Sequence, residues 1–305
     1  MSDLTVEQQA KLLALTDLKG IGDKRAQKLV SVARGVDSVY ETPFSTLSDL
    51  HYVSEQTFAQ LQDLDSEISQ YESQIRQAAE DGVSLATPYD SLYPEQLQTQ
   101  HAPLKLFTKG DESLLTSSMV SFAGSRDAND SAIEWTSRIA GGLADEGYTI
   151  VSGGAFGIDA AAHRAALDKR GPTIIVSPSG HNVPYPKAHE ELFKRVINEG
   201  LVVSHRFPNQ DPARGGFLYR NRTNSALSEA IIIAAASDDG GSMSQFETAV
   251  KQGKTVFVPD ESVGSLPDSG LAEMRASDDT VVVESLGDVL DEINVNDGQS
   301  SLNDW

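Results

Sequence analysis

The sequence predicts an α/β fold: an extended, Rossmann-like, doubly wound and mostly parallel sheet, preceded by a small all-α domain. Three observations support this prediction. From residue 83 onward, short apolar runs alternate with helical patterns, which is typical of a parallel sheet. Most of these runs are continuously apolar, so helices should cover both sheet faces. Before residue 83, apolar residues recur at helical spacing. The predicted strands are 104–108, 120–123, 149–152, 173–177, 201–204, 231–235, 255–258 and 280–283.

The pattern divides the chain into three segments: a helical domain at 1–82, a sheet domain at 83–284 and an acidic tail at 285–305. The first boundary lies at Asp81-Gly82, where a helix stop signal precedes the apolar stretch. After Arg275 the chain has no Lys or Arg, and the last helical pattern, 286–293, is followed by Asn, Asp, Gly and Ser residues. We therefore expect the tail to be disordered.

The composition argues against several classes of protein. No apolar run approaches the roughly 20 residues needed to span a bilayer, and the N-terminus lacks the basic and apolar regions of a secretion signal. Without cysteine, the chain has no disulfides and no thiolate metal sites. The 6 histidines are scattered, so we expect no metal and no other cofactor. A cytoplasmic location is the default expectation.

The charge balance is unusual and leaves two interpretations open. Lys+Arg number 24 against Asp+Glu 45, a formal net charge of -21. Such a surface is typical of a halophilic protein in a salty cytoplasm, where salt screens self-repulsion within about 3 Å at 1 M. It also fits an acidic protein with a basic partner. A negative surface repels nucleic acid, so the positions of the few basic residues must decide whether the ligand is a nucleic acid.

The stretch Leu-Lys-Gly-Ile-Gly-Asp-Lys-Arg at 18–25 lies between two short helical patterns. Apolar-Gly-x-Gly in this position resembles the hairpin of the helix-hairpin-helix family. There the free N–H groups of the second helix meet a phosphate. The candidates for such a contact are Gly20, Gly22 and Lys24. The alternative is a plain helical hairpin that uses glycine for its turn.

Two strand–turn–helix units lie at the centre of the predicted sheet. One contains Gly124-Ser125-Arg126, and the other begins with Ser152-Gly153-Gly154 and ends with Asp159. Such turns place backbone N–H groups and a helix N-terminus at one sheet edge, where an anion binds readily. With Arg126 in the first turn, the favoured ligand is a phosphate. For Asp159 we favour a structural role, the capping of the next helix.

Three later segments also follow predicted strands. An irregular loop at 178–187 carries Lys187. The segment at 217–228 has Arg220, Asn221 and Arg222 before a helical run, and arginine forks suit phosphates; a salt-bridged helix start is the alternative. Aromatic rings beside such arginines can stack bases, and the candidates are Phe217 and Tyr219. Finally, Gly240, Gly241 and Ser242 open another helix after a strand.

Taken together, these motifs follow a known order and spacing. They are Gly-Ser-Arg at 124–126, Ser-Gly-Gly-Ala-Phe-Gly-Ile-Asp-Ala-Ala-Ala-His at 152–163, Tyr-Pro-Lys at 185–187, Phe-x-x-Arg-Asn-Arg at 217–222, Leu-Ser at 227–228 and Gly-Gly-Ser at 240–242. From about residue 87 to residue 259 the chain resembles the DNA-processing protein A family, also called DprA or Smf. The resemblance implies a non-catalytic Rossmann-like protein that binds single-stranded DNA and protects incoming or exposed strands in natural transformation and recombination. It also implies the loading of a RecA-family recombinase and a homodimer formed through this domain.

The resemblance implies that several residues hold successive backbone phosphates: Arg126, Ser152, Gly153, Lys187, Arg220, Asn221 and Arg222. The chain departs from the family pattern at His205, where Glu is usual, and in Thr-Asn-Ser at 223–225, where apolar residues are usual. The winged-helix domain that follows in many members is not expected here.

A second function class stays open, a nucleotide-binding or nucleoside-monophosphate-hydrolysing enzyme. Related Rossmann-like families hydrolyse such nucleotides with Gly-Gly-x-Gly-Thr-x-x-Glu, and the segment 240–247 approaches this motif. It has Met243 where a glycine should approach the phosphate. Glu247 would be the acid–base residue. A nucleotide-sensing module is a third alternative. A protein that binds single-stranded DNA should bind oligonucleotides and not mononucleotides. Ligand length therefore distinguishes it from a nucleotide enzyme or a nucleotide sensor.

Overall fold

The computed structural model describes residues 3–98, 103–213, 215–236, 241–263 and 269–300. Contacts within the chain divide it into two compact units, Met1–Thr108 and Lys109–Trp305. Each unit is described by itself.

The first unit is mainly helical, as predicted. The first helix packs against a hydrophobic core, because its Leu12 and Leu13 are fully buried. Thr5 and Gln8 start this helix with a capping box, in which each side chain bonds the other's backbone N–H. The elements are α1 (Val6–Ala14), η1 (Leu15–Asp17), α2 (Asp23–Ala33), α3 (Val36–Glu41), α4 (Phe44–Leu47), α5 (Glu55–Leu61), α6 (Asp65–Glu80), β1 (Ser84–Ala86), η2 (Glu95–Leu97) and β2 (Leu106–Gly110).

This unit extends beyond residue 82, where we expected its boundary, to Thr108. The reason is hydrogen bonding between the lead-in segment and α1. The Asp90 carboxylate accepts from the backbone N–H of Leu4 at 2.7 Å and from Gln9 Nε2 at 3.2 Å. Strand β1, which is not among the predicted strands, pairs antiparallel with β2. The sequence pattern changes at residue 83, but the first compact unit continues to Thr108.

The second unit contains a parallel sheet in the order β6-β5-β4-β3-β7-β8-β9. Every neighbouring pair in this order is parallel, and each strand lies within one or two residues of its predicted range. The strands are β3 (Met119–Gly124), β4 (Thr149–Ser152), β5 (Thr173–Ser177), β6 (Leu201–Ser204), β7 (Ala230–Ala235), β8 (Thr255–Pro259) and β9 (Thr280–Val283). The predicted fold class is confirmed.

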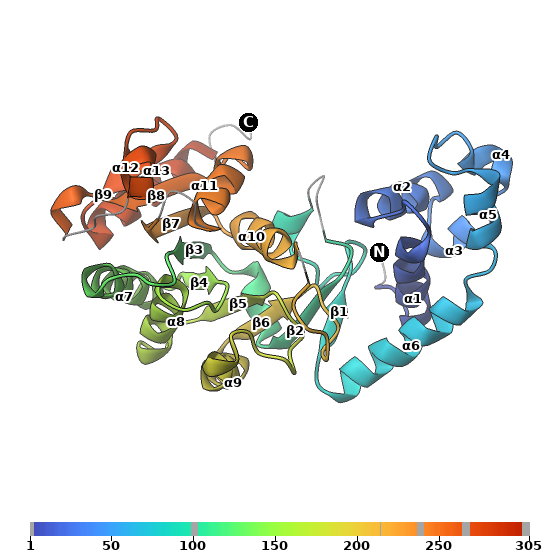
Figure 1. Cartoon of the computed structure of the whole chain (residues 1–305), viewed down its shortest axis with the longest axis horizontal. Helices are drawn as coiled ribbons and strands as arrows, with labels where there is room; N and C mark the ends of the chain where they lie inside the picture. Colours follow the sequence, from blue (N-terminus) through green and yellow to red (C-terminus); the bar gives the residue numbers. More distant parts are fainter. Residues whose placement is uncertain (1–2, 99–102, 214, 237–240, 264–268, 301–305) are drawn as a thin grey trace. The chain divides into compact units, whose positions relative to one another are not determined.

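Helices cover both faces of this sheet. They are α7 (Asp130–Asp145), α8 (Ile158–Asp168), α9 (Glu190–Glu199), α10 (Gly216–Leu227), α11 (Gly241–Lys251), α12 (Ser269–Arg275) and α13 (Leu286–Ser300), with short turns η3 (Glu112–Thr116), η4 (Lys187–His189) and η5 (Glu261–Val263). In β7, Ile232 packs in one core with α7, α8 and α13, whereas Ile231 and Ile233 pack on the opposite side with α11 and α12. Figure 1 shows α7 and α8 on one side of the strands and α10 and α11 on the other.

The last described helix is longer than we expected. Instead of a disordered tail after Ile293, α13 continues to Ser300. Val289 and Ile293 are buried in the core that α7 and α8 line. These two contacts anchor the helix, and a helix that has formed extends at little further cost.

The order of the strands fixes where a ligand can bind. From β3 the chain moves to β4, β5 and β6 on one side, and from β7 it moves to β8 and β9 on the other. Strands β3 and β7 are parallel neighbours. The order in which successive strands are added to the sheet therefore reverses between them. In open parallel sheets, ligands bind in the crevice beyond the carboxyl ends of the strands at this point.

Candidate functional site

Two adjoining cavities lie beyond the carboxyl ends of the central strands. The larger cavity, of about 410 Å³, falls in the size range of small-molecule sites. Seven of the predicted phosphate-binding residues line it: Gly124, Ser125, Arg126, Arg220, Asn221, Gly241 and Ser242. The smaller cavity, of about 90 Å³, is lined by Arg126, Gly153, Ala155, Phe156, Pro178, Tyr185, Pro186, Phe217 and Arg220. Arg126 and Arg220 therefore belong to both.

Arg220 is a buried cation that lines both cavities. Only 6% of its surface is exposed, and Nη1 lies 3.5 Å from Oδ2 of Asp159. Burial lowers the pKa of the Arg220 guanidinium below its usual value; Asp159 opposes this effect and the charge of Arg126 adds to it. The buried Nε has no hydrogen-bond partner among the described residues. The side chain thus retains a donor for a ligand.

Asp159 connects Arg220 to the turn after β4. Its Oδ2 accepts hydrogen bonds from the backbone N–H groups of Gly153 and Ala155, both at 3.2 Å. We expected it to cap α8, but the residue at the cap position is Gly157, and no side chain caps that helix. The carboxylate instead fixes the preceding loop and the arginine together.

Gly153 is required by the position of Arg220. A Cβ atom on Gly153 would overlap the guanidinium carbon and Nη1 of Arg220. Its backbone is not in the left-handed region, so the conformation itself does not demand glycine. The missing side chain makes room for the guanidinium group.

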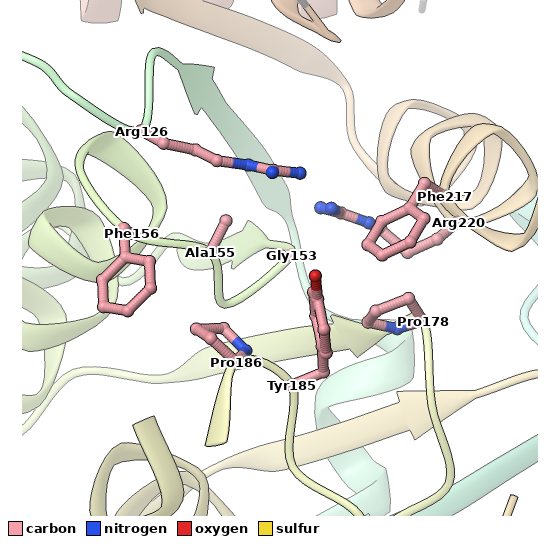
Figure 2. A pocket seen from close by; sticks show the side chains of 9 residues that line it. All are labelled: Arg126, Gly153, Ala155, Phe156, Pro178, Tyr185, Pro186, Phe217 and Arg220. Carbon is pink, nitrogen blue, oxygen red and sulfur yellow. The ribbon is translucent and has the colours of Figure 1, made fainter. Parts of the chain in front are cut away.

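Arg126 reaches the same cavities from the turn after β3. The turn is held by a hydrogen bond from the N–H of Ser125 to the carbonyl of Ala235, 3.0 Å long, and a Cβ on Gly124 would collide with Ile158. The Arg126 side chain is exposed. Figure 2 shows the guanidinium groups of Arg126 and Arg220 pointing toward one another across the smaller cavity. Two cations facing one space favour an anion between them.

The start of α11 also lines the larger cavity. Gly241 is exposed and Ser242 is buried, and both line the cavity, as does Asn221 of α10. The N-terminal N–H groups of a helix add positive potential there. Gly240, the third predicted residue of this turn, lies outside the described residues.

Within the second unit, four of the predicted residues that the structure describes lie outside both cavities. The hydroxyl of Ser152 is buried and donates to the carbonyl of Phe122 at 2.7 Å. Lys187 is exposed in η4. Arg222 is exposed on α10, two residues from Arg220 and therefore on the opposite side of the helix. The ring of Tyr219 packs edge-on against His205, with centroids 4.6 Å apart.

The two departures from the family pattern contact each other. Nε2 of His205 lies 2.9 Å from the hydroxyl of Thr223, so the unusual residue after β6 is matched by an unusual residue in α10. The neighbouring Asn224 is fully buried, and its side-chain amide has no partner among the described residues. The inner side of α10 is polar here as a result.

The three residues of the predicted hairpin lie in the first unit. Gly20 has a φ of 81°, Gly22 precedes the first turn of α2 without a side-chain cap, and Lys24 is exposed. Arg25 donates from Nη1 to the carbonyl of Gly20 at 2.7 Å and its guanidinium lies over the ring of Tyr52. Arg25 therefore closes the turn itself.

Glu247, the acid–base residue of the enzyme alternative, lies outside both cavities. It is exposed and forms an ion pair with Lys251 on the next turn of α11, at 3.1 Å. Within the described ranges, there is no group of three His, Asp or Glu residues that could hold a metal ion. Every described helix is also too short or too polar to span a membrane.

Comparison with known proteins assigns the family. The family model described as DNA recombination-mediator protein A matches residues 84–294, most of the chain. The chain belongs to this family. Among similar proteins, DNA processing protein DprA of Streptococcus pneumoniae is 38% identical over 181 residues, which cover 59% of this chain and 64% of that protein. Protein Smf of Synechocystis is 28% identical over 267 residues, covering 86% of this chain and 65% of that protein. The chain thus spans less than two thirds of the length of these relatives.

Solved structures of family members share the fold. DNA processing protein A from S. pneumoniae superimposes with a TM-score of 0.76 at 29% identity, covering 96% of this chain and 99% of that one. DNA processing protein A from Helicobacter pylori, described for its single-stranded DNA binding mode, gives a TM-score of 0.62 at 30% identity over 70% of this chain and 96% of that one. The resemblance seen in the sequence is confirmed.

Proposed function

We propose that this protein binds single-stranded DNA at the two cavities, with a backbone phosphate held between Arg126 and Arg220. The observation that carries the proposal is the pair of guanidinium groups that face one space at the switch point of the sheet (Figure 2). Arginine forks hold phosphate oxygens bidentately. A diester phosphate carries one negative charge, which compensates the second cation that Asp159 leaves unpaired.

The next phosphates of the strand would lie along the larger cavity. There Gly124, Ser125 and Gly241 allow close approach of the backbone, and Asn221 and Ser242 supply polar side chains. Lys187 and Arg222 would hold the strand further out on the exposed surface. In the first unit, Gly20, Gly22 and Lys24 would contact a phosphate through the N-terminus of α2.

The role that fits this binding is recombination mediation. The protein protects incoming or exposed strands and helps load a RecA-family recombinase, and it acts as a homodimer formed through the sheet unit. Membership of the recombination-mediator family and the likeness to the H. pylori protein support this role. The assay is the rate of recombinase filament growth on a strand already coated by single-strand binding protein. We expect acceleration by this protein, and equal rates with and without it would refute the loading role.

Competition separates strand binding from the nucleotide alternatives. A fluorescent dT oligonucleotide is bound to the protein, and unlabelled oligonucleotide, duplex or AMP is added. We expect the unlabelled strand to displace the probe and AMP to leave it bound, because successive phosphate contacts bind the strand. Displacement by AMP would instead favour a nucleotide enzyme or sensor.

A further inference from the structure

Charge is distributed unevenly along the first unit. Residues 19–34 contain one acidic residue and five basic ones, Lys19, Lys24, Arg25, Lys28 and Arg34. Residues 35–98 contain 12 acidic residues and a single basic one. The whole chain has a formal net charge of -21, so the positive charge of the short segment stands apart from its surroundings. A local excess of one sign indicates a surface for a partner of the opposite sign.

Four of these basic residues are exposed on α2 or at its two ends. Helix α2 buries three apolar side chains on one side, whereas Lys24 and Lys28 are exposed. These two lysines are four residues apart and therefore lie one above the other on the opposite side of the helix. Lys19 precedes the helix and Arg34 is its C-cap residue, and both are exposed. We call Lys19, Lys24, Lys28 and Arg34 the basic face; the helix that carries it is about 16 Å long for 11 residues.

No side chain of the basic face forms an ion pair with another described residue. Elsewhere in the first unit, Lys11 pairs with Asp37 at 2.8 Å and Arg76 pairs with Glu72 at 3.5 Å. Arg25, the fifth basic residue of the segment, closes the hairpin turn instead. Like charges one turn apart also destabilise a helix. The basic face therefore carries positive charge that a polyanion would compensate.

The remaining surface of the first unit restricts which polyanion fits. Among the described residues, the exposed large apolar side chains all belong to the second unit. A protein partner needs an apolar or aromatic interface core, and unpaired bases need rings on which to stack. The basic face is therefore suited to a ligand that is held by its phosphates alone. Duplex DNA presents phosphates most densely, with one charge per about 1.7 Å of its axis, against about 3.4 Å for one of its strands.

We propose that the basic face binds the phosphate backbone of double-stranded DNA. Contacts to phosphates fix a protein on a duplex without reading its sequence. The proposal rests on the proposed function and deepens it, because it names a duplex as the source of the phosphate that Lys24 contacts. Single-stranded and double-stranded DNA then bind to different units of the chain, so one protein molecule holds both at once.

The test measures two labelled probes, a blunt-ended duplex and a dT oligonucleotide, by fluorescence anisotropy over a series of KCl concentrations. The variant is Lys19→Gln/Lys28→Gln. The matched control is Lys169→Gln/Lys251→Gln, which removes two exposed lysines of the second unit outside both cavities and changes the net charge equally. We expect the control to bind the duplex like wild type. In the variant, the slope of log affinity against log salt should be shallower by about 2, roughly 0.9 for each lost phosphate contact, and the affinity for dT should be that of wild type.

A second variant separates the basic face from the two cavities. Arg126→Ala/Arg220→Ala should lose the dT oligonucleotide and keep the duplex, because its basic face is intact. Wild type saturated with unlabelled dT should still bind the labelled duplex. We expect duplex binding at 0.1 M KCl, where salt screens repulsion by the distant acidic residues over about 10 Å.

The other outcomes contradict the basic face in distinguishable ways. If Lys19→Gln/Lys28→Gln binds the duplex with the wild-type slope, or the control loses as much, the basic face is not the binding surface. If Arg126→Ala/Arg220→Ala loses the duplex too, the duplex binds at the cavities. Wild type that binds dT but no duplex refutes this proposal alone, whereas wild type that binds the duplex but no dT refutes the proposed function. Equal melting temperatures of wild type and variants show that any loss is not unfolding.

Discussion

At the scale of single residues, Gly153 and Arg220 act as one unit. The three atoms nearest to a Cβ added to Gly153 all belong to the Arg220 guanidinium group. Since that side chain is flexible at its end, the clash is relieved when the guanidinium group leaves its place beside Asp159. Under the proposed function, the glycine therefore has a role in binding that its own chemistry does not suggest.

This coupling gives a double-mutant test. Gly153→Ala should weaken binding of the dT oligonucleotide about 10-fold or more, as much as Arg220→Ala does, because each removes a charge-assisted contact to phosphate. The double variant should bind no more weakly than Arg220→Ala alone, because the new methyl group fills vacated space. Affinities come from anisotropy titrations. Additive losses in the double variant would show that Gly153 and Arg220 act independently.

Some of these residue roles could have been read from the sequence. Arg220 and Arg222 are two positions apart, and residues at that spacing in a helix face opposite sides, so only one of them can enter a given cavity. That Phe156 and Tyr185 line the smaller cavity could not be read in the same way. Both lie in irregular loops, where no periodicity fixes the direction of a side chain, and only the packing against His189 and Phe217 orients them.

At the scale of elements, a buried histidine links α8 to β5. His163 is fully buried, and its Nδ1 lies 2.8 Å from the hydroxyl of Thr173. That hydroxyl donates to the carbonyl of Ile150, so it can only accept from the histidine. Nδ1 therefore carries the proton of a neutral ring. Nε2 is buried and has no partner among the described residues.

This arrangement predicts a pH dependence of stability. Burial, together with the charges of His189, Arg220 and Arg164, lowers the pKa of His163 from 6.5 to about 3. Below pH 6.5 the unfolded chain binds a proton that the folded chain does not, so stability is complete above that pH and falls on acidification toward the folded pKa.

The variant His163→Leu isolates this contribution. Urea unfolding at pH 7.5, 6 and 5 gives the slope of the unfolding free energy with pH. We expect the slope of the variant below pH 6.5 to be smaller than that of wild type by up to about 1.4 kcal/mol per pH unit, whatever its stability at pH 7.5. Equal slopes would mean that His163 is not the neutral, buried group described.

The elements themselves were predictable to different degrees. Strands such as β4 and β5 are continuous apolar runs bounded by turn residues, and their predicted ranges match the structure. The end of the first unit was not predictable, because it depends on hydrogen bonds from Gln9 and Leu4 to Asp90, more than 80 residues away in the chain. A pattern within a short window contains no information on such contacts.

At the scale of the whole molecule, the net charge of -21 makes folding sensitive to salt. Acidic side chains that outnumber the basic ones repel each other in the compact state, and KCl screens this repulsion. We interpret the charge as an adaptation to a salty cytoplasm. The melting temperature should then rise between 0.1 M and 2 M KCl. A melting temperature that falls over this range would contradict the halophile interpretation.

Salt also sets how the strand is held. Phosphate contacts weaken by a slope of roughly 0.7 per contact as log salt rises, whereas stacking of a base persists. At molar KCl the variant Phe217→Ala, which removes a ring that lines both cavities, should therefore lose at least as much affinity for the dT oligonucleotide as Arg220→Ala does. This expectation depends on the whole chain, because its acidic residues outnumber its basic residues and few cations are left to contact phosphates.

The most direct test of the central claim is binding of a labelled dT oligonucleotide to Arg126→Ala/Arg220→Ala by anisotropy, in low and in molar KCl. The matched control is Arg138→Ala/Arg164→Ala, which removes two exposed arginines outside both cavities and changes the net charge equally. We expect the control to bind like wild type and the cavity variant to lose binding at low salt. If both variants weaken binding equally, overall charge governs it, and the phosphate site between Arg126 and Arg220 is refuted.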